Sequence, residues 1–155
     1  MTVYFLKYLH VIGACVLLGT GAGIAFFMLL AHLQRDPIVV AAVARIVVIA
    51  DFIFTATAVI AQPITGVLLA RTVGYLLWER WIVWSIALYI LTGAFWLPVV
   101  WMQIRMRDLA GEAAWRQEPL PHRYDQFFRL WFAFGFPAFG AVLAIFWLMI
   151  AKPTT

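Results

Sequence analysis

The sequence predicts an all-α integral membrane protein whose single domain, residues 1–155, is a bundle of four transmembrane helices. The chain of 155 residues is 66% hydrophobic and only 12% charged, whereas a soluble domain usually carries about 25% charged residues. Its apolar residues gather into four runs that reach or exceed the roughly 20 residues needed to cross a bilayer. Backbone groups inside a bilayer must be bonded within the spanning segment, so we expect helices rather than open strands.

The four helices are expected at about residues 4–30, 37–70, 81–104 and 130–151. In the first run, no Lys, Arg, Asp or Glu lies between Lys7 and Arg35. That run is much longer than the roughly 7–15 apolar residues of a signal peptide, so we expect a retained helix. The second run begins at Pro37, and its uncharged part is 52–70. The third run and the fourth are separated by the most polar connection, 105–129. Its first part, 105–116, would extend the third helix into water until Pro119 and Pro121 end it.

Basic residues predict the orientation of the bundle. Seven of the eleven lie on the side of the first and third connections: Arg35, Arg45, Arg105, Arg107, Arg116, Arg123 and Arg129. The opposite side carries Lys7, Arg71, Arg80 and Lys152. Because basic loops stay in the cytoplasm, this asymmetry predicts a multi-pass protein of the bacterial inner membrane with both termini in the periplasm. Four tryptophans (Trp78, Trp81, Trp84 and Trp147) would form the outer aromatic belt, and Trp101 and Trp131 the inner one.

Composition also excludes several classes of function. The single cysteine, Cys15, excludes an intrachain disulfide and a cysteine-based metal finger. The net charge of +4 comes from residues in the connections between apolar runs, so we expect the lipid bilayer, and no nucleic acid, as a partner.

His10 is the leading candidate for a functional residue, because an imidazole inside an apolar helix is costly without a partner. Lys7 lies three residues earlier on the same helix face, and Gly13 continues that face inward. Neutral imidazole is a common axial ligand of haem iron. The small residues would leave room for a flat macrocycle, and Lys7 would pair with a propionate. The alternative is a histidine hydrogen-bonded to a neighbouring helix, with glycines that let the helices approach.

The other two histidines are predicted to lie far from His10. His32 is roughly 33 Å further along the same helix at 1.5 Å per residue, and His122 lies on the His32 side. His10 would therefore be the sole axial ligand, or a sixth ligand would come from Met149 on the last helix, from Lys7 or from a second subunit. Met149 lies at a suitable depth, but a packing role is the alternative.

The second helix carries further polar residues inside the membrane. Gln62 and Thr65 are placed to hydrogen-bond His10 or the edge of a cofactor. Asp51 is expected to pair with Arg105 or Arg129, or to belong to a proton or substrate path. A soft-metal set suited to Cu(I) is also conceivable; its members would be Met28, His32, Met102 and Met106.

Two resemblances follow from these residues. The start Lys7-Tyr8-Leu9-His10-Val11-Ile12-Gly13 resembles the first helix of HemJ-type protoporphyrinogen oxidases and of CopD-like membrane domains, which implies a b-type haem on His10 with Lys7 nearby. Across nearly the whole chain, the sequence resembles bacterial four-helix membrane proteins of unknown function. That resemblance rests on the segments 19–27, 96–100, 105–107 and 135–139.

The leading hypothesis is therefore b-type haem binding that serves electron transfer or HemJ-like porphyrin redox chemistry. The alternatives are a non-catalytic accessory subunit of a larger membrane complex, and copper handling. A membrane redox partner and a homo-oligomer are compatible with all of them.

Overall fold

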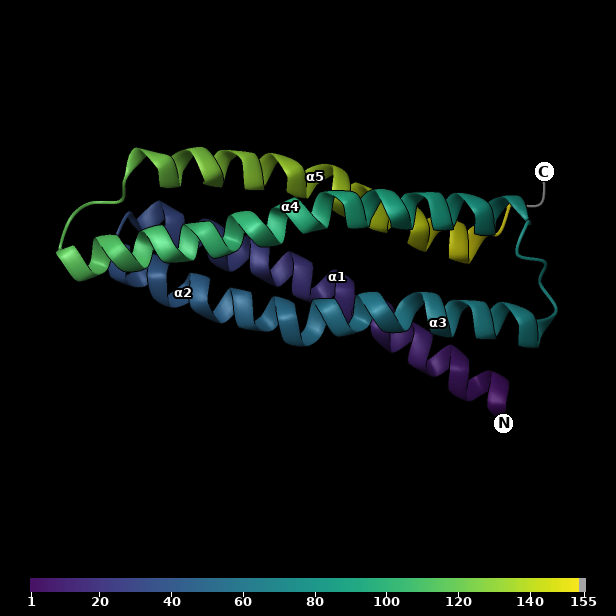
Figure 1. Ribbon diagram of the computed structural model, residues 1–155. Coiled ribbons are helices and arrows are strands. Elements are labelled where there is room, and N and C mark those ends of the chain that lie inside the picture. Colours follow the sequence, from purple (N-terminus) through teal and green to yellow (C-terminus); the bar gives the residue numbers. More distant parts are fainter. Residues whose placement is uncertain (154–155) are drawn as a thin grey trace.

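The computed structural model describes residues 1–153, and the regular structure in that range is helical throughout. In chain order the elements are α1 (Thr2–Gln34), α2 (Pro37–Ala50), η1, a π-helix (Asp51–Thr55), α3 (Ala56–Val73), α4 (Arg80–Arg116) and α5 (His122–Ala151). The segments α2, η1 and α3 follow one another in a single long rod (Figure 1). Within this range four helical segments are long and apolar enough to span a membrane, so the predicted bundle is confirmed.

Polar residues continue two of the helices, α4 and α5, beyond their apolar runs. α4 extends through 105–116, as predicted, and ends at Gln117 in a left-handed conformation. At 37 residues it is about 55 Å long, well beyond the roughly 30 Å apolar core of a bilayer. α5 begins at His122 rather than near 130. Pro121 immediately precedes its first residue. The first two turns of α5 are polar, and a polar segment can form a helix outside the membrane, so the helix starts earlier than the apolar run.

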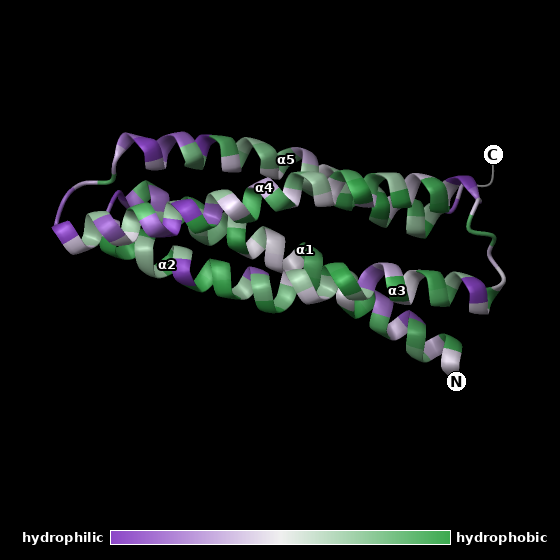
Figure 2. Cartoon of the chain, viewed as in Figure 1, coloured by the Kyte–Doolittle hydropathy of each residue, from purple (hydrophilic) through white to green (hydrophobic). Residues whose placement is uncertain are grey.

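The two ends of the bundle are chemically different. We call the end with the α1–α2 and α4–α5 connections the arginine side, and the opposite end, with both termini and the α3–α4 connection, the terminus side. Figure 2 shows hydrophilic residues gathered at the arginine side, with a largely apolar stretch towards the terminus side. A two-residue turn joins α1 to α2 on the arginine side, where the Asp36 side chain accepts a hydrogen bond from the Ile38 amide at 2.8 Å.

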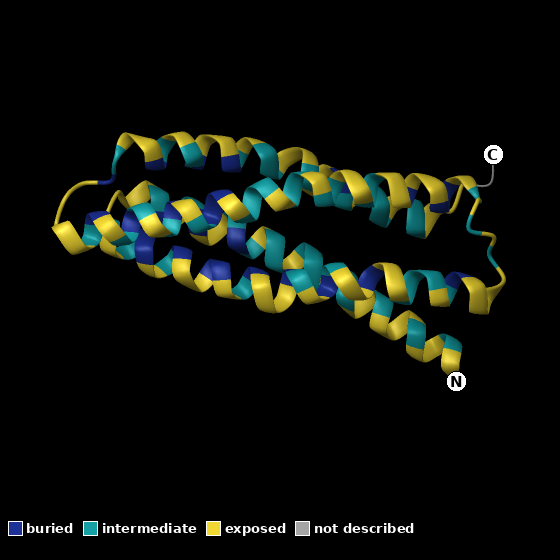
Figure 3. Ribbon diagram, viewed as in Figure 1, coloured by how far each residue is buried: buried dark blue, intermediate teal, exposed yellow. Residues whose placement is uncertain are grey.

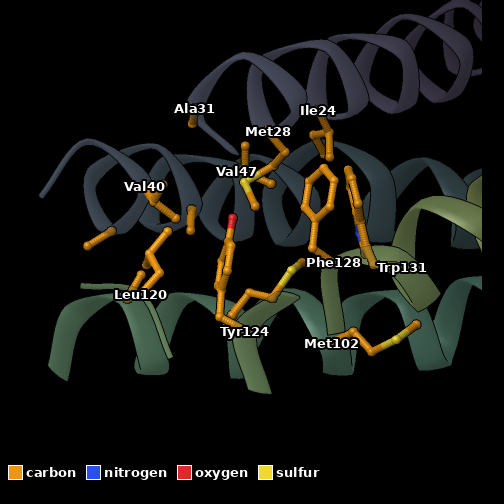
Figure 4. Packing of buried hydrophobic residues seen from close by; sticks show 14 residues of the cluster. Ile24, Met28, Ala31, Val40, Val47, Met102, Leu120, Tyr124, Phe128 and Trp131 are labelled. Carbon is orange, nitrogen blue, oxygen red and sulfur yellow. The ribbon is translucent and has the colours of Figure 1, made fainter. Parts of the chain in front are cut away.

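The main core lies in the arginine-side half, where all four membrane helices pack together. Met28, Val40, Met106 and Tyr124 are fully buried there. Figure 4 shows Tyr124 and Phe128 of α5 pointing towards residues of α1 and α2 in this core. Figure 3 shows the buried residues concentrated in this half of the bundle. This half therefore forms the rigid part of the fold.

In the terminus-side half the bundle separates into two helix pairs. α1 packs along α3, and α4 packs along α5, while contacts of α3 with α4 and α5 are sparse (Figure 1). A small cluster of Ala70, Trp81 and Ile82 joins the pairs near the end of α3. The Tyr89 hydroxyl also donates a hydrogen bond across to the Val59 carbonyl.

Two tryptophans predicted for the aromatic belts are buried instead. Trp81 is 6% exposed and Trp131 is 4% exposed. Each indole donates to a protein acceptor, which is how a buried tryptophan is usually satisfied. The exposed Trp78, Trp84 and Trp147 remain compatible with a belt at the terminus side.

Candidate functional site

His10 lies on the face of α1 that packs against α3. Its Nδ1 is 2.9 Å from the Thr65 hydroxyl oxygen. The ring also lies directly over Gly66, because a Cβ at that glycine would be 3.2 Å from His10 Cε1. The imidazole is therefore held by one hydrogen bond and lies close against Gly66 of α3.

The hydrogen bonds of Thr65 bear on which ring nitrogen of His10 carries the proton. The Thr65 hydroxyl lies 2.8 Å from the Ala61 carbonyl and 3.2 Å from the Gln62 carbonyl. When its one hydrogen points to a carbonyl, the hydroxyl oxygen accepts from His10. The neutral tautomer then carries its hydrogen on Nδ1, which leaves the lone pair on Nε2. A metal-ligating histidine typically has this arrangement, in which the non-ligating nitrogen donates to an orienting group.

Gln62 fixes the backbone of α1 at the same place. Its buried side-chain nitrogen donates to the His10 carbonyl at 2.8 Å. A Cβ at Gly13 would be only 2.5 Å from that nitrogen, so Gly13 makes room for Gln62. The prediction that Gln62 and Thr65 bond to His10 is confirmed. Gly13, however, contacts α3 instead of leaving open space for a macrocycle, because the Gln62 amide occupies that space.

Lys7 and Met149 occupy the terminus side but on different helix pairs. Lys7 is exposed on α1, about one turn from His10. Met149 on α5 packs against the cluster of Ala70, Trp81 and Ile82. Ala70 is one turn beyond Gly66 on α3, so Met149 lies in the same half of the bundle as His10 but belongs to the opposite helix pair.

The other histidines lie at the arginine side, as predicted. His32 stacks on Phe128 with ring centroids 3.6 Å apart and an interplanar angle of 6°. His122 is the exposed first residue of α5. Across residues 1–153, no group of three or more His, Cys, Asp or Glu side chains converges on a metal position. Met28, Met102 and Met106, three members of the soft-metal set, are buried in the main core.

Asp51 does not pair with either predicted arginine. The ion pairs of the described chain join Arg35 to Asp125, Arg107 to Asp108 and Arg116 to Glu112. Arg105 instead lies over the ring of Trp101, with its guanidinium carbon 5.7 Å from the centroid. Asp51 is only 3% exposed and its neighbours are Trp96 and Gln103. The prediction was wrong because arginines near a helix end extend towards water rather than into the bundle.

Gly66 is the one residue of the His10 site that the sequence did not single out. The sequence feature that could have indicated it is a glycine next to Thr65. Because Gly66 has no side chain, the His10 ring can approach the helix there. Glycines are frequent in membrane helices because they allow helices to approach closely. A glycine at this position therefore does not distinguish a histidine contact from ordinary helix packing.

Comparison with known proteins assigns the chain to a family. The model of the family described as "Predicted integral membrane protein (DUF2269)" matches residues 4–153. The chain belongs to this family. Comparisons with curated proteins and with solved structures gave no match. DUF2269 membership agrees with the four membrane helices and gives no support to the HemJ-type or CopD-like resemblance of the first helix.

Proposed function

We propose that the protein binds a b-type haem in the terminus-side half of the bundle, with His10 Nε2 as an axial ligand. The observation that carries this proposal is the hydrogen bond between His10 Nδ1 and Thr65, whose own hydrogen is engaged by a backbone carbonyl. It leaves the ligating nitrogen of His10 with a free lone pair, and none of the hydrogen bonds among residues 1–153 involves that nitrogen.

The residues around His10 fit such a group in two further respects. The half-buried ring is fixed by Thr65 and Gly66, so little side-chain entropy is lost when a ligand binds. Lys7 provides a positive charge one turn nearer the membrane surface, where a propionate would lie.

A bound haem would supply one-electron chemistry, which suits electron transfer or porphyrin redox chemistry. The protein would contribute the ligand His10, the orientation of its ring through Thr65, and shielding from water by the surrounding helices. The sixth ligand would be Met149, Lys7 or a group from a second copy or a membrane redox partner.

Replacing Thr65 by valine tests the orienting hydrogen bond. Valine keeps the shape of threonine but removes the hydroxyl, so His10 loses its fixed tautomer. Loss of such a partner typically lowers metal affinity by roughly 10–100-fold, and we expect a loss in that range for haem, measured by spectroscopic titration. The matched control is Thr72→Val, because Thr72 bonds only to the Leu68 carbonyl of its own helix. Equal affinity in both variants would contradict the proposed role of Thr65.

An accessory role in a larger membrane complex is the second candidate. The N-terminal half of α1 exposes Tyr4, Phe5, Tyr8 and Ile12, which another subunit would cover. In that case Thr65 and Gly66 only fix helix packing. Purified parent protein, prepared with ample haem, distinguishes the two: a Soret band supports haem binding, and a colourless protein supports the accessory role. Copper handling has weaker support, because its methionines already fill the core.

We further propose that the protein lies in a bacterial inner membrane with its terminus side in the periplasm, from the excess of basic residues on the arginine side. A reporter that is active only in the periplasm should be active when fused after Thr155, a position outside the described residues. The same reporter inserted within 111–119 should be silent. The reversed pattern would place His10 on the cytoplasmic side.

A further inference from the structure

The π-helix η1 contains a buried carboxyl group that the proposed haem site does not use. Asp51 begins η1 and is 3% exposed, although it lies within the membrane-spanning rod formed by α2, η1 and α3. Single π-turns inside helices occur frequently at functional sites. An ionisable residue at such a position requires a compensating partner.

Asp51 is surrounded by hydrogen-bond donors. Trp96 Nε1 lies 3.4 Å from Asp51 Oδ1. The Gln103 amide, oriented so that both its ends are satisfied, donates to Asp51 Oδ2 at 3.0 Å. Its oxygen accepts from Trp131 Nε1 at 3.2 Å. Because an indole nitrogen can only donate, Trp131 fixes this orientation, and both oxygens of Asp51 face donors.

Thr55 adds an unused polar atom to the same place. Its hydroxyl is buried, with the residue 7% exposed, and has no hydrogen-bond partner. It lies beside the Asp51 carboxyl. Buried hydroxyls are normally bonded, so the Thr55 hydroxyl is available to a ligand held by the neighbouring carboxyl.

No basic side chain of residues 1–153 compensates Asp51. None of the ion pairs among these residues includes Asp51. The charged or titratable residues nearest to it along each helix are Cys15 and His32 on α1, Arg45 on α2, Arg71 on α3, Arg105 on α4 and Arg129 on α5. Of these, Cys15 and the four arginines are exposed, and His32 stacks on Phe128. A buried carboxylate without a partner costs several kcal/mol. Trp96 and Gln103 donate hydrogen bonds to Asp51, but none of the ion pairs of the described residues gives it a positive charge.

We propose that Asp51 and Thr55 form a binding site for one monovalent cation, either a proton or a sodium ion. Carboxylate and hydroxyl oxygens are hard ligands that suit both. Trp96 and Gln103 hold the carboxyl in place through its two oxygens. Gln103 and Trp131 are two residues from Arg105 and Arg129, so the site lies just inside the arginine-side edge of the apolar band. The cation would enter from that side, independently of His10.

The test is carbodiimide labelling of the full-length protein in lipid nanodiscs. Dicyclohexylcarbodiimide adds across a protonated carboxyl in an apolar environment, one molecule per carboxyl with no leaving group, and mass spectrometry locates the adduct. Labelling is measured over a pH series in choline chloride and in sodium chloride of equal ionic strength. We expect an adduct on Asp51. Suppression by sodium identifies sodium as the ligand, and a fall with rising pH alone identifies the proton. Absence of the adduct at every pH, or labelling that depends on neither variable, would overturn the proposal.

Two conservative variants separate binding from folding. Asp51→Asn keeps the shape of the side chain and should abolish the adduct. Thr55→Val should weaken sodium protection by about tenfold or more, or move the pH profile downwards if the ligand is a proton, because the bound cation loses one of its two oxygen ligands. The matched control is Thr57→Val, since Thr57 bonds to the Ile53 carbonyl at 2.6 Å and is exposed. Identical profiles for Thr55→Val and Thr57→Val would remove Thr55 from the site.

Discussion

His10→Ala protein should lose most of its bound haem while still inserting into the membrane. The substitution removes the nitrogen that would ligate the iron, whereas insertion depends on the apolar length of α1, which does not change. The measurement is haem per protein, taken from the Soret band and a pyridine haemochrome assay of protein purified from membranes. Equal haem content in His10→Ala and the parent would refute the proposed ligand.

Three further variants give this experiment its controls. His122→Ala and His32→Ala should keep their haem, because both residues lie at the arginine side of the bundle. Lys7→Ala should bind haem more weakly without losing it, since a partly solvated ion pair contributes only about 0–1 kcal/mol. A loss of haem in His122→Ala equal to that in His10→Ala would show that the measurement reports general damage instead of a ligand.

Phe128→Ala should be the most destabilising single substitution on α5. Phe128 is 6% exposed and stacks with His32, Tyr124 and Phe132 in the main core. Truncating a buried phenylalanine costs about 3–5 kcal/mol, because the cavity left behind collapses only partly. We expect a loss of this size in the free energy of unfolding in mixed micelles. The variant should also lose melting temperature, because the four helices meet around this ring.

The matched control for this prediction is Phe136→Ala. Phe136 lies two turns further along α5 and is 65% exposed. Its removal leaves no enclosed cavity, so the free energy of unfolding should change by less than about 0.5 kcal/mol. Comparable losses in both variants would mean that the arginine-side cluster is not the stabilising core.

The sequence determined the fold class and the depth of each candidate residue. Apolar runs of about 20 residues or more predicted the four helices, because such a run satisfies its backbone groups within the bilayer by forming a helix. Depth along a helix follows from residue number at 1.5 Å per residue. This placed His10 far from His32 and His122, and it placed Gln62 and Thr65 level with His10. It also predicted the extension of α4 through Arg116, since charged residues there continue a helix outside the membrane.

Only the tertiary structure decided which faces of the helices meet. Depth is a property of one helix, whereas rotation about its axis is set by packing against its neighbours. For this reason three features were not predictable. They are the contact of His10 with Gly66, the contact of the Gln62 amide with Gly13, and the burial of Trp131. The same limit explains Asp51, which had arginines at comparable depth but bonds to Trp96 and Gln103. The separation of the terminus-side half into two pairs likewise arises from packing, because apolar side chains are satisfied equally by lipid and by another helix.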